Sequence, residues 1–249
     1  MYLSEPTLLD TVKKQYHFKL NAHSTALITF MLLQIGALFL SFTNNKYTIE
    51  YASFSNVSTI HLSNDLNVIL AIIWAFFLGI MLTTAVRRNE AFSFVTTRLS
   101  NHLANFLFML TASLIAGIIA TLTGPVLKLF GFLFYKEMIL YTPSIIEAPI
   151  DFSLRIITAI AYVLLFLLIG YTISSLIQLN KFFIIGFVVL FIVFSSSTES
   201  WNGAQYLADV FSFFADEQSF PFFLLKTIGA VFGLFAVSAL ITNRLEVRN

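Results

Sequence analysis

The sequence predicts an all-α membrane protein with six transmembrane helices, an interfacial amphipathic helix near the N-terminus, and both termini in the cytoplasm. Three observations support this fold class. Hydrophobic residues make up 58% of the 249 residues and charged residues only 11%, a composition outside that of soluble domains. Apolar runs recur along the whole chain, with no long polar region between them. Lysine and arginine gather in alternate connecting segments, as the positive-inside rule requires. Residues 1–249 are therefore expected to form one transmembrane domain.

The first 23 residues (MYLSEPTLLDTVKKQYHFKLNAH) contain no continuous apolar run, so they do not resemble a secretory signal peptide. An apolar side is offered by Leu8, Leu9, Val12, Tyr16 and Phe18, and a basic side by Lys13, Lys14 and Lys19. This segment is expected to lie at the membrane surface as an amphipathic helix.

Six apolar runs follow this segment. A helix rises about 1.5 Å per residue and the hydrocarbon layer is about 30 Å thick, so each span needs about 20 apolar residues. Five of the runs contain no Lys, Arg, Asp or Glu, and the last contains only Lys226. The fifth run is short, but its final serines can extend it because their hydroxyls bond back to helix carbonyls. The expected spans are residues 24–42, 66–86, 103–122, 156–178, 182–197 and 220–241.

Basic residues set the expected orientation, because lysine and arginine are retained on the cytoplasmic side during insertion. With the N-terminus inside, the outer segments hold Lys46, Lys128, Lys136 and Arg155. The inner segments hold nine basic residues: Lys13, Lys14, Lys19, Arg87, Arg88, Arg98, Lys181, Arg244 and Arg248. The protein is therefore expected to be a multi-pass protein of the cell membrane with cytoplasmic ends.

Residues 124–142 (GPVLKLFGFLFYKEMILYT) are apolar enough to enter the membrane, yet they carry Lys128 and Lys136. Pro125 and Gly131 are expected to interrupt a helix there. An outer interfacial or re-entrant element is favoured over a seventh span, because a seventh span would place the basic C-terminus outside.

Between the second and third spans lies a basic segment, residues 87–102, which is expected to face the cytoplasm. Phe92, Val95 and Leu99 share one face at helical spacing, so the segment is expected to form a short amphipathic helix. One interpretation is a flank that only sets topology. The other is a coupling element that docks on a cytoplasmic partner.

The coupling interpretation draws on a resemblance. The segment resembles the cytoplasmic helix of ATP-binding-cassette type-2 exporter permeases, where an acidic residue precedes an apolar stretch and a Pro-hydrophobic-Ser/Thr-Arg element. Glu90 and residues 94–98 (FVTTR) fill the matching places, with Phe94 where the family has proline. The residues that would contact a partner ATPase are Arg87, Arg88, Glu90, Phe92, Phe94, Val95 and Arg98.

The resemblance implies a permease subunit that works with other chains. No G-x-x-x-x-G-K-[ST] pattern occurs in the sequence, so ATP and magnesium are expected on a separate ATPase subunit. A second permease chain, identical or paralogous, would complete the pathway, and the cargo would be hydrophobic or amphipathic, such as a peptide or a lipid-like compound. In the family, the loop corresponding to residues 198–219 folds into short helices that close the outer mouth.

Four residues inside the spans are candidates for the pathway or for helix packing. Gln34 is an amide in the first span, where a partner on another helix is expected. Lys226 either extends its side chain to the interface or pairs within the protein. Gly229 and Gly233 form a small-xxx-small pair that permits close helix approach, with packing inside this chain favoured over packing between chains.

Other classes of function find little support. Cysteine is absent, the four histidines lack metal-ligand spacing, and no catalytic motif is present, so the chain is not expected to be an enzyme. The net charge of +1 gives no reason to expect a nucleic-acid partner. The alternatives to a permease are a membrane scaffold or immunity protein that transports nothing, and an ion-coupled carrier or channel.

Overall fold

The computed structural model describes residues 7–43, 46–52, 55–61, 63–84, 98–134, 148–195, 197–198, 201–202, 205–206, 209, 212–214, 216–217 and 219–244. Helices account for most of these residues. The helices are α1 (Leu8–Ala22), α2 (Ser24–Thr43), α3 (Asp65–Leu82), α5 (Arg98–Phe134), α6 (Pro149–Leu179), α7 (Phe182–Ser195) and α9 (Phe220–Arg244).

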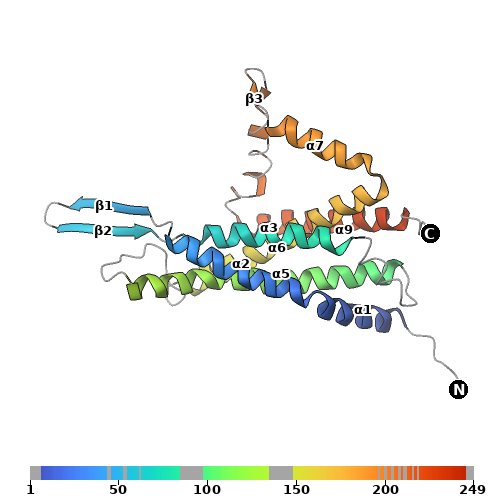
Figure 1. The fold of residues 1–249 in the computed structure, drawn as a ribbon, viewed down its shortest axis with the longest axis horizontal. Helices are drawn as coiled ribbons and strands as arrows, with labels where there is room; N and C mark the ends of the chain where they lie inside the picture. Colours follow the sequence, from blue (N-terminus) through green and yellow to red (C-terminus); the bar gives the residue numbers. More distant parts are fainter. Residues whose placement is uncertain are drawn as a thin grey trace.

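The long helices α2, α3, α5, α6 and α9 lie side by side in an elongated bundle (Figure 1). Each is long and apolar enough to cross a membrane: Ser24–Ser41, Asp65–Leu82, Leu99–Phe134, Pro149–Leu179 and Phe220–Thr242. The prediction of a multi-span helical membrane protein is confirmed at this level. The run predicted at 182–197 forms α7, whose 14 residues would reach only about 21 Å at 1.5 Å per residue.

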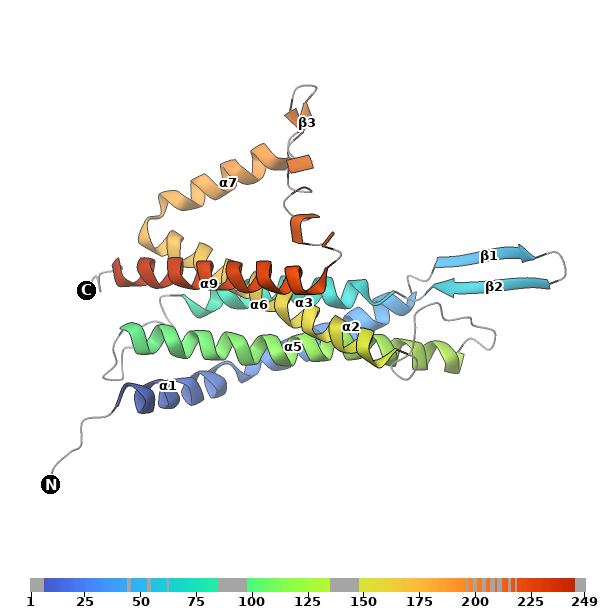
Figure 2. The same ribbon diagram turned by 180° about the vertical axis from the view of Figure 1, so that it is seen from behind.

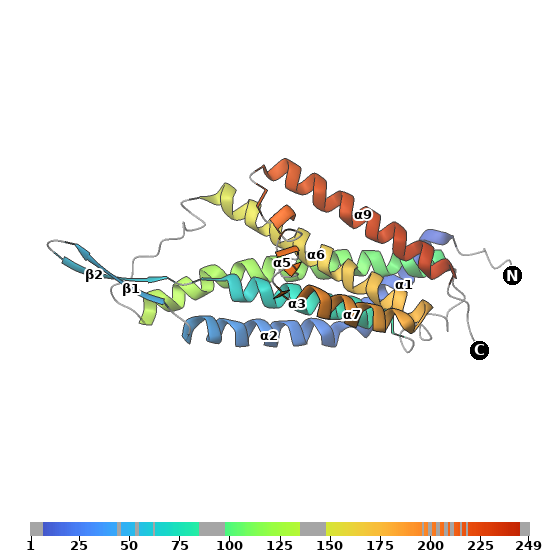
Figure 3. The same cartoon turned by 90° about the horizontal axis from the view of Figure 1, so that it is seen from above.

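Helices α6 and α9 run in the same direction, as Figures 2 and 3 both show. Near the start of α9, the Phe223 ring lies 5.2 Å from the ring of Tyr162 on α6. Two neighbouring parallel helices require the chain between them to return to the opposite end of the bundle. Helix α7 lies on this return path and stands away from the bundle (Figure 1). Asn180 separates α6 from α7, because its side-chain oxygen accepts a hydrogen bond of 3.1 Å from the amide of Phe182.

The expectation that Pro125 and Gly131 interrupt the helix is wrong. Helix α5 continues through both residues and ends at Phe134, so residues 124–134 extend the third span. A proline removes one backbone hydrogen bond, and spanning helices tolerate this where neighbouring groups satisfy the backbone. The carbonyl that loses its helical donor is that of Thr121, four residues before the proline. Residues 135–142 of the predicted interfacial element lie outside the described residues.

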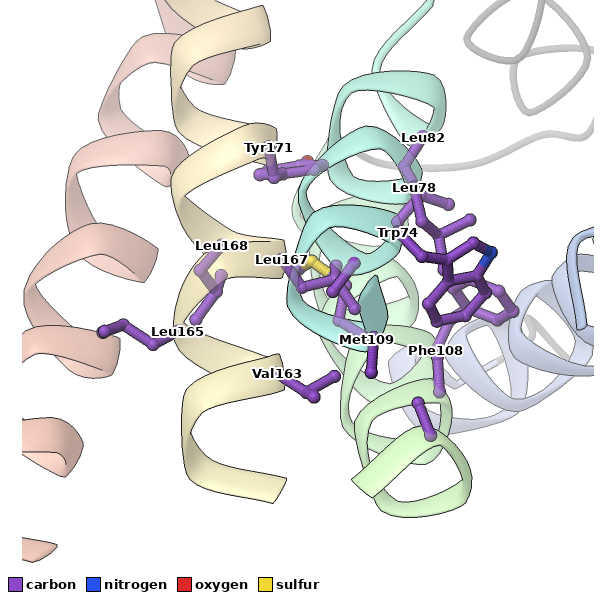
Figure 4. Packing of buried hydrophobic residues seen from close by; sticks show 14 of the residues in the cluster. Trp74, Leu78, Leu82, Phe108, Met109, Val163, Leu165, Leu167, Leu168 and Tyr171 are labelled. Carbon is purple, nitrogen blue, oxygen red and sulfur yellow. The ribbon is translucent and has the colours of Figure 1, made fainter. Parts of the chain in front are cut away.

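The core of the bundle is formed by side chains of α2, α3, α5 and α6 (Figure 4). Phe30 of α2 is fully buried and its ring lies 4.6 Å from the ring of Trp74 on α3. Met109 of α5 and Leu167 of α6 are also fully buried. Since lipid tails are as apolar as leucine, close packing rather than water exclusion holds such helices together.

Glycines allow α3 and α6 to approach each other backbone to backbone. A Cβ on Gly79 would overlap the carbonyl oxygen of Leu167 and lie 2.8 Å from the Tyr171 nitrogen. A Cβ on Gly170 would overlap the carbonyl oxygen of Phe76. The close contact between α3 and α6 therefore depends on Gly79 of α3, which faces α6, and on Gly170 of α6, which faces α3.

Helix α1 packs against α5 and ends at His23, where α2 begins. Thr7 caps its start, with the hydroxyl oxygen accepting a hydrogen bond of 3.3 Å from the Asp10 amide. The face toward the bundle buries Val12, Gln15 and Lys19. The predicted N-terminal helix is thus present, and it uses polar as well as apolar residues to pack.

Two short antiparallel hairpins were not predicted. The larger one pairs β1 (Lys46–Ala52) with β2 (Ser55–His61). It projects from the end of the bundle where α2 ends and α3 begins, which we call the hairpin end (Figure 1). The smaller one pairs β3 (Ser197–Thr198) with β4 (Trp201–Asn202) after α7. The larger hairpin lies in a segment predicted as an outer loop. The smaller one contradicts the end of the fifth predicted span, because α7 ends at Ser195 and Ser197 belongs to β3.

Candidate functional site

The predicted coupling segment connects α3 to α5. Most of its candidate residues lie outside the described residues: Arg87, Arg88, Glu90, Phe92, Phe94 and Val95. Arg98 is the first residue of α5. The described ends of the segment lie at the end of the bundle where α6 and α9 also finish (Figure 2).

Gln34 has the partner that its place in a span predicts. Its side chain is 2% exposed, and its amide nitrogen donates to the backbone carbonyl of Asn67 on α3 at 3.0 Å. The Asn67 side chain donates to the Asn64 side-chain oxygen at 2.9 Å, and Thr123 of α5 donates to the same oxygen at 2.9 Å. These contacts join α2, α3 and α5 at the hairpin end of the bundle, which is the role of interhelical packing.

Among the described residues, none packs against Gly229 or Gly233. A Cβ on either glycine would meet no atom within 4 Å, and both positions are exposed on α9. The favoured interpretation of packing within the chain is therefore wrong. The close approaches are made instead by Gly79 and Gly170, and by Gly117 against the backbone of Ile160.

Lys226 pairs within the protein, and its side chain stays 26% exposed. It forms an ion pair with Glu217 and donates to the backbone carbonyl of Phe213 at 3.2 Å. Its ammonium also lies 4.1 Å from the centre of the Phe213 ring, a cation–π contact. Tyr162 of α6 adds a hydrogen bond of 3.0 Å to the Phe214 carbonyl. Hydrogen bonds and an ion pair therefore hold the described residues of segment 212–217 against α6 and α9.

The hydrogen bond from Lys226 lowers the pKa of the Glu217 carboxyl below its ordinary value. A lowered pKa means that the carboxylate form is stabilised in the folded state. The contact between segment 212–217 and α9 thus depends on an ionised Glu217.

A second set of polar side chains is buried between α5, α6 and α9. His102 and Asn105 of α5, Tyr171 of α6 and Ser238 of α9 are each at most 3% exposed. His102 Nδ1 lies 3.1 Å from the Tyr171 hydroxyl, and Asn105 donates to the same hydroxyl at 3.1 Å. On its other side, His102 Nε2 lies 3.3 Å from the Phe235 carbonyl. We call these four residues the histidine cluster.

The hydrogen bonds of the histidine cluster determine the tautomer of its imidazole. A backbone carbonyl only accepts, so His102 Nε2 carries the proton that is donated to Phe235. Nδ1 of the neutral ring is then an acceptor, and the Tyr171 hydroxyl donates to it. Tyr171 accepts in turn from Asn105. The Phe235 ring stacks on the imidazole with centroids 4.4 Å apart.

His102 is the last residue of the basic segment 87–102 that the sequence predicts, and the histidine cluster was not predicted. The signal that could have revealed it is the spacing of Asn101, His102 and Asn105, three polar residues within two turns of an otherwise apolar helix. Polar and ionisable residues inside a span usually have a functional or packing role.

No protein-family model matches this chain, and neither a curated protein nor a solved structure shows significant similarity to it. The site must therefore be interpreted from its own chemistry. Within the described part of the chain, no group of three or more His, Asp or Glu residues is arranged to hold a metal ion. The described sites are thus hydrogen-bonded clusters and one ion pair within a membrane bundle.

Proposed function

We propose that this chain is the membrane-spanning permease subunit of an ATP-binding-cassette exporter of the type-2 class. It would carry a hydrophobic or amphipathic cargo, such as a peptide or a lipid-like compound, across the cell membrane. A separate cytoplasmic ATPase subunit would bind ATP and magnesium. A second permease chain would complete the pathway.

The main support is the way basic residues are sorted between the two ends of the bundle. Helix α1 begins, α3 ends, α5 begins, and α6 and α9 end at one end of the bundle (Figures 1 and 2). The segments at this end are those in which nine basic residues were counted, including the candidate coupling segment. Under the positive-inside rule this end faces the cytoplasm, where an ATPase subunit would dock.

Six spans follow if α7 and its flanks cross the membrane. The parallel direction of α6 and α9 requires one return between them. Helix α7 is apolar on all sides, with Phe182, Ile185 and Val188 among its exposed residues. A helix that is hydrophobic all round suits a lipid environment.

The exposed Gly229 and Gly233 support the expectation of a second chain. Small residues at this spacing allow the backbones of two spanning helices to approach closely. Because no described residue of this chain occupies the space beside them, that face of α9 is open to a helix from another chain.

The test is purification of the chain from its native membrane in mild detergent, followed by detection of a co-purifying ATP-hydrolysing subunit. The test variant carries Glu90→Ala and Arg98→Ala. The matched control carries Lys46→Ala and Glu50→Ala, which remove one acid and one base from β1 at the opposite end of the bundle.

We expect the ATPase to accompany the wild type and the control and to be lost from the Glu90→Ala, Arg98→Ala variant. A wild-type chain that purifies alone would overturn the exporter proposal and favour a scaffold or a carrier. An ATPase that is retained by both variants would leave the exporter standing but remove segment 87–102 from the docking site.

A further inference from the structure

The histidine cluster joins three helices through one ionisable side chain, and the exporter proposal assigns it no role. His102 lies four residues from the start of α5, which is about 6 Å along the helix axis. The imidazole is therefore close to the end of the bundle although it is buried. A proton from the adjoining water has only a short distance to travel.

Two buried amide oxygens lie on either side of His102 along α5. The Oδ1 atoms of Asn101 and Asn105 are buried and have no hydrogen-bond partner among the described residues. The two residues are 8% and 3% exposed, and they lie one turn apart on the same face of α5. Buried acceptors of this kind are normally satisfied by water or another donor.

We propose that His102, together with Tyr171 and Asn105, forms a proton-binding site that controls the packing of α9 against α5 and α6. The neutral state is the one described, with Tyr171 donating to His102 Nδ1. One proton from water then adds to Nδ1, which becomes a donor. The proposal concerns this chain alone and does not depend on an ATPase partner.

The cluster can accept this proton by exchanging donors and acceptors. When Nδ1 donates, the Tyr171 oxygen accepts, and the tyrosine hydroxyl hydrogen needs another acceptor. Asn105 supplies one if its amide turns by half a rotation, because its unpartnered oxygen then faces the hydroxyl. A single amide rotation thus keeps the imidazole and the Tyr171 hydroxyl hydrogen-bonded in both charge states of His102, while one end of the Asn105 amide has no partner among the described residues in either state.

Protonation should loosen α9, because a charge is costly in apolar surroundings unless water or a counter-charge reaches it. The ionisable group that contacts His102 from α6 is Tyr171, while α9 presents Phe235 and Ser238, neither of which is charged. On α1, which packs against α5, Lys19 and His23 are buried, whereas Asp10, Lys13, Lys14 and His17 are exposed. The ionisable residues toward the hairpin end are Asp65, Lys128, Asp151, Arg155, Tyr162 and Lys226, and those at the helix ends near His102 are Arg98 and Arg244. The described carboxylate at this end is Asp10, which is exposed and accepts from the Thr7 hydroxyl, so no buried carboxylate among the described residues at this end neutralises a protonated imidazole.

Distance measurement between spin labels tests the proposal. The chain has no cysteine, so Leu99→Cys on α5 and Leu240→Cys on α9, both exposed positions, give one labelled pair. We expect the α5–α9 distance distribution to shift toward longer values from about pH 8 to about pH 5, the range in which histidine titrates. His102→Gln should abolish the shift, and His17→Gln, an exposed histidine of α1, should preserve it.

A second measurement covers the case in which His102→Gln does not fold. Histidine-selective ¹⁵N labelling of the full chain follows the four imidazoles directly by NMR. We expect the His102 signals to titrate, and Tyr171→Phe to move the midpoint by removing the partner of Nδ1. A His102 signal that stays unchanged from about pH 8 to about pH 5 would overturn the proposal. So would a distance shift that His102→Gln leaves intact.

Discussion

At the scale of single residues, the packing of the fold depends most clearly on two glycines, which carry no Cβ. Gly79 and Gly170 let the backbones of α3 and α6 meet, and any Cβ there would overlap a backbone carbonyl. Backbone cannot move aside as a flexible side chain can. The two helices would have to separate, and the packing that holds a membrane bundle together would weaken.

Gly79→Ala and Gly170→Ala are therefore expected to destabilise the folded chain, each by about 1–3 kcal/mol, as overpacking does in tight cores. The measurement is the thermal unfolding midpoint in detergent. Gly36→Ala is the matched control, since its Cβ would meet no atom within 4 Å, and it should be neutral or stabilising by up to about 1 kcal/mol through helix propensity. Equal midpoints for all three variants would contradict the α3–α6 contact.

The ion pair between Lys226 and Glu217 gives a prediction about acid. The lowered pKa of Glu217 means that its stabilising contribution is complete above the ordinary value of 4.5 and is lost as the pH falls through the folded-state pKa. A nitroxide at Ser212→Cys should therefore become more mobile in EPR spectra below about pH 4.5.

Glu217→Gln should give the mobile spectrum already at neutral pH, because the amide cannot pair with the Lys226 charge. Asp209→Asn is the control, since Asp209 accepts from Gln205 and lies in the same loop. A spectrum of Glu217→Gln that matches the wild type would show that the pair does not hold segment 212–217.

At the scale of elements, the lengths of the apolar runs and the charges beside them predicted the bounds of α2, α3 and α9 closely. For these helices, apolar content alone marks where they begin and end. The same reasoning placed the end of the third span too early. Pro125 and Gly131 are expected to interrupt a helix, but α5 continues past both. Local sequence carries little information on whether neighbouring elements will support a helix through a proline.

The strands were missed for a different reason. Tyr47, Ile49 and Tyr51 alternate with polar residues in β1, which is the period of a strand. Because apolar helices dominate the chain, this short alternating stretch was predicted to be a loop. The histidine cluster was missed because partners such as Tyr171 and Ser238 come from distant parts of the chain, and their meeting follows only from tertiary packing.

The exposed face of α9 gives an element-scale prediction. Gly229→Leu with Gly233→Leu should leave the fold intact, because the space beside both residues is open. If a second chain packs there, self-association measured by energy transfer in vesicles should weaken about tenfold, or ~1.4 kcal/mol. Gly36→Leu, an open glycine on α2, is the control. Unchanged self-association in the double variant would exclude α9 as the contact between chains.

At the scale of the whole molecule, the direction of each helix decides the topology. The hairpin end of the bundle and the opposite end, where segment 87–102 connects α3 to α5, must face opposite sides of the membrane if the five long helices cross it. Whether residues 198–219 lie on the same side of the membrane as β1 and β2 then depends on α7. Among the described helices, α7 is an apolar helix that is too short to span the membrane by itself. Its flanking residues would have to complete the crossing.

Single cysteines in this cysteine-free chain can settle the point with a membrane-impermeant maleimide applied to sealed vesicles of known orientation. Six spans predict that Thr48→Cys and Gln205→Cys react from the outer side, while Lys181→Cys reacts only from the inner side. If Gln205→Cys instead reacts from the same side as Lys181→Cys, α7 does not cross. Helix α9 would then either run in the opposite sense through the membrane or fail to cross it. Because α9 runs parallel to α6 and shares the histidine cluster with it, that result would also require a different packing of α9. The labelling pattern therefore tests the number of spans and the helix arrangement together.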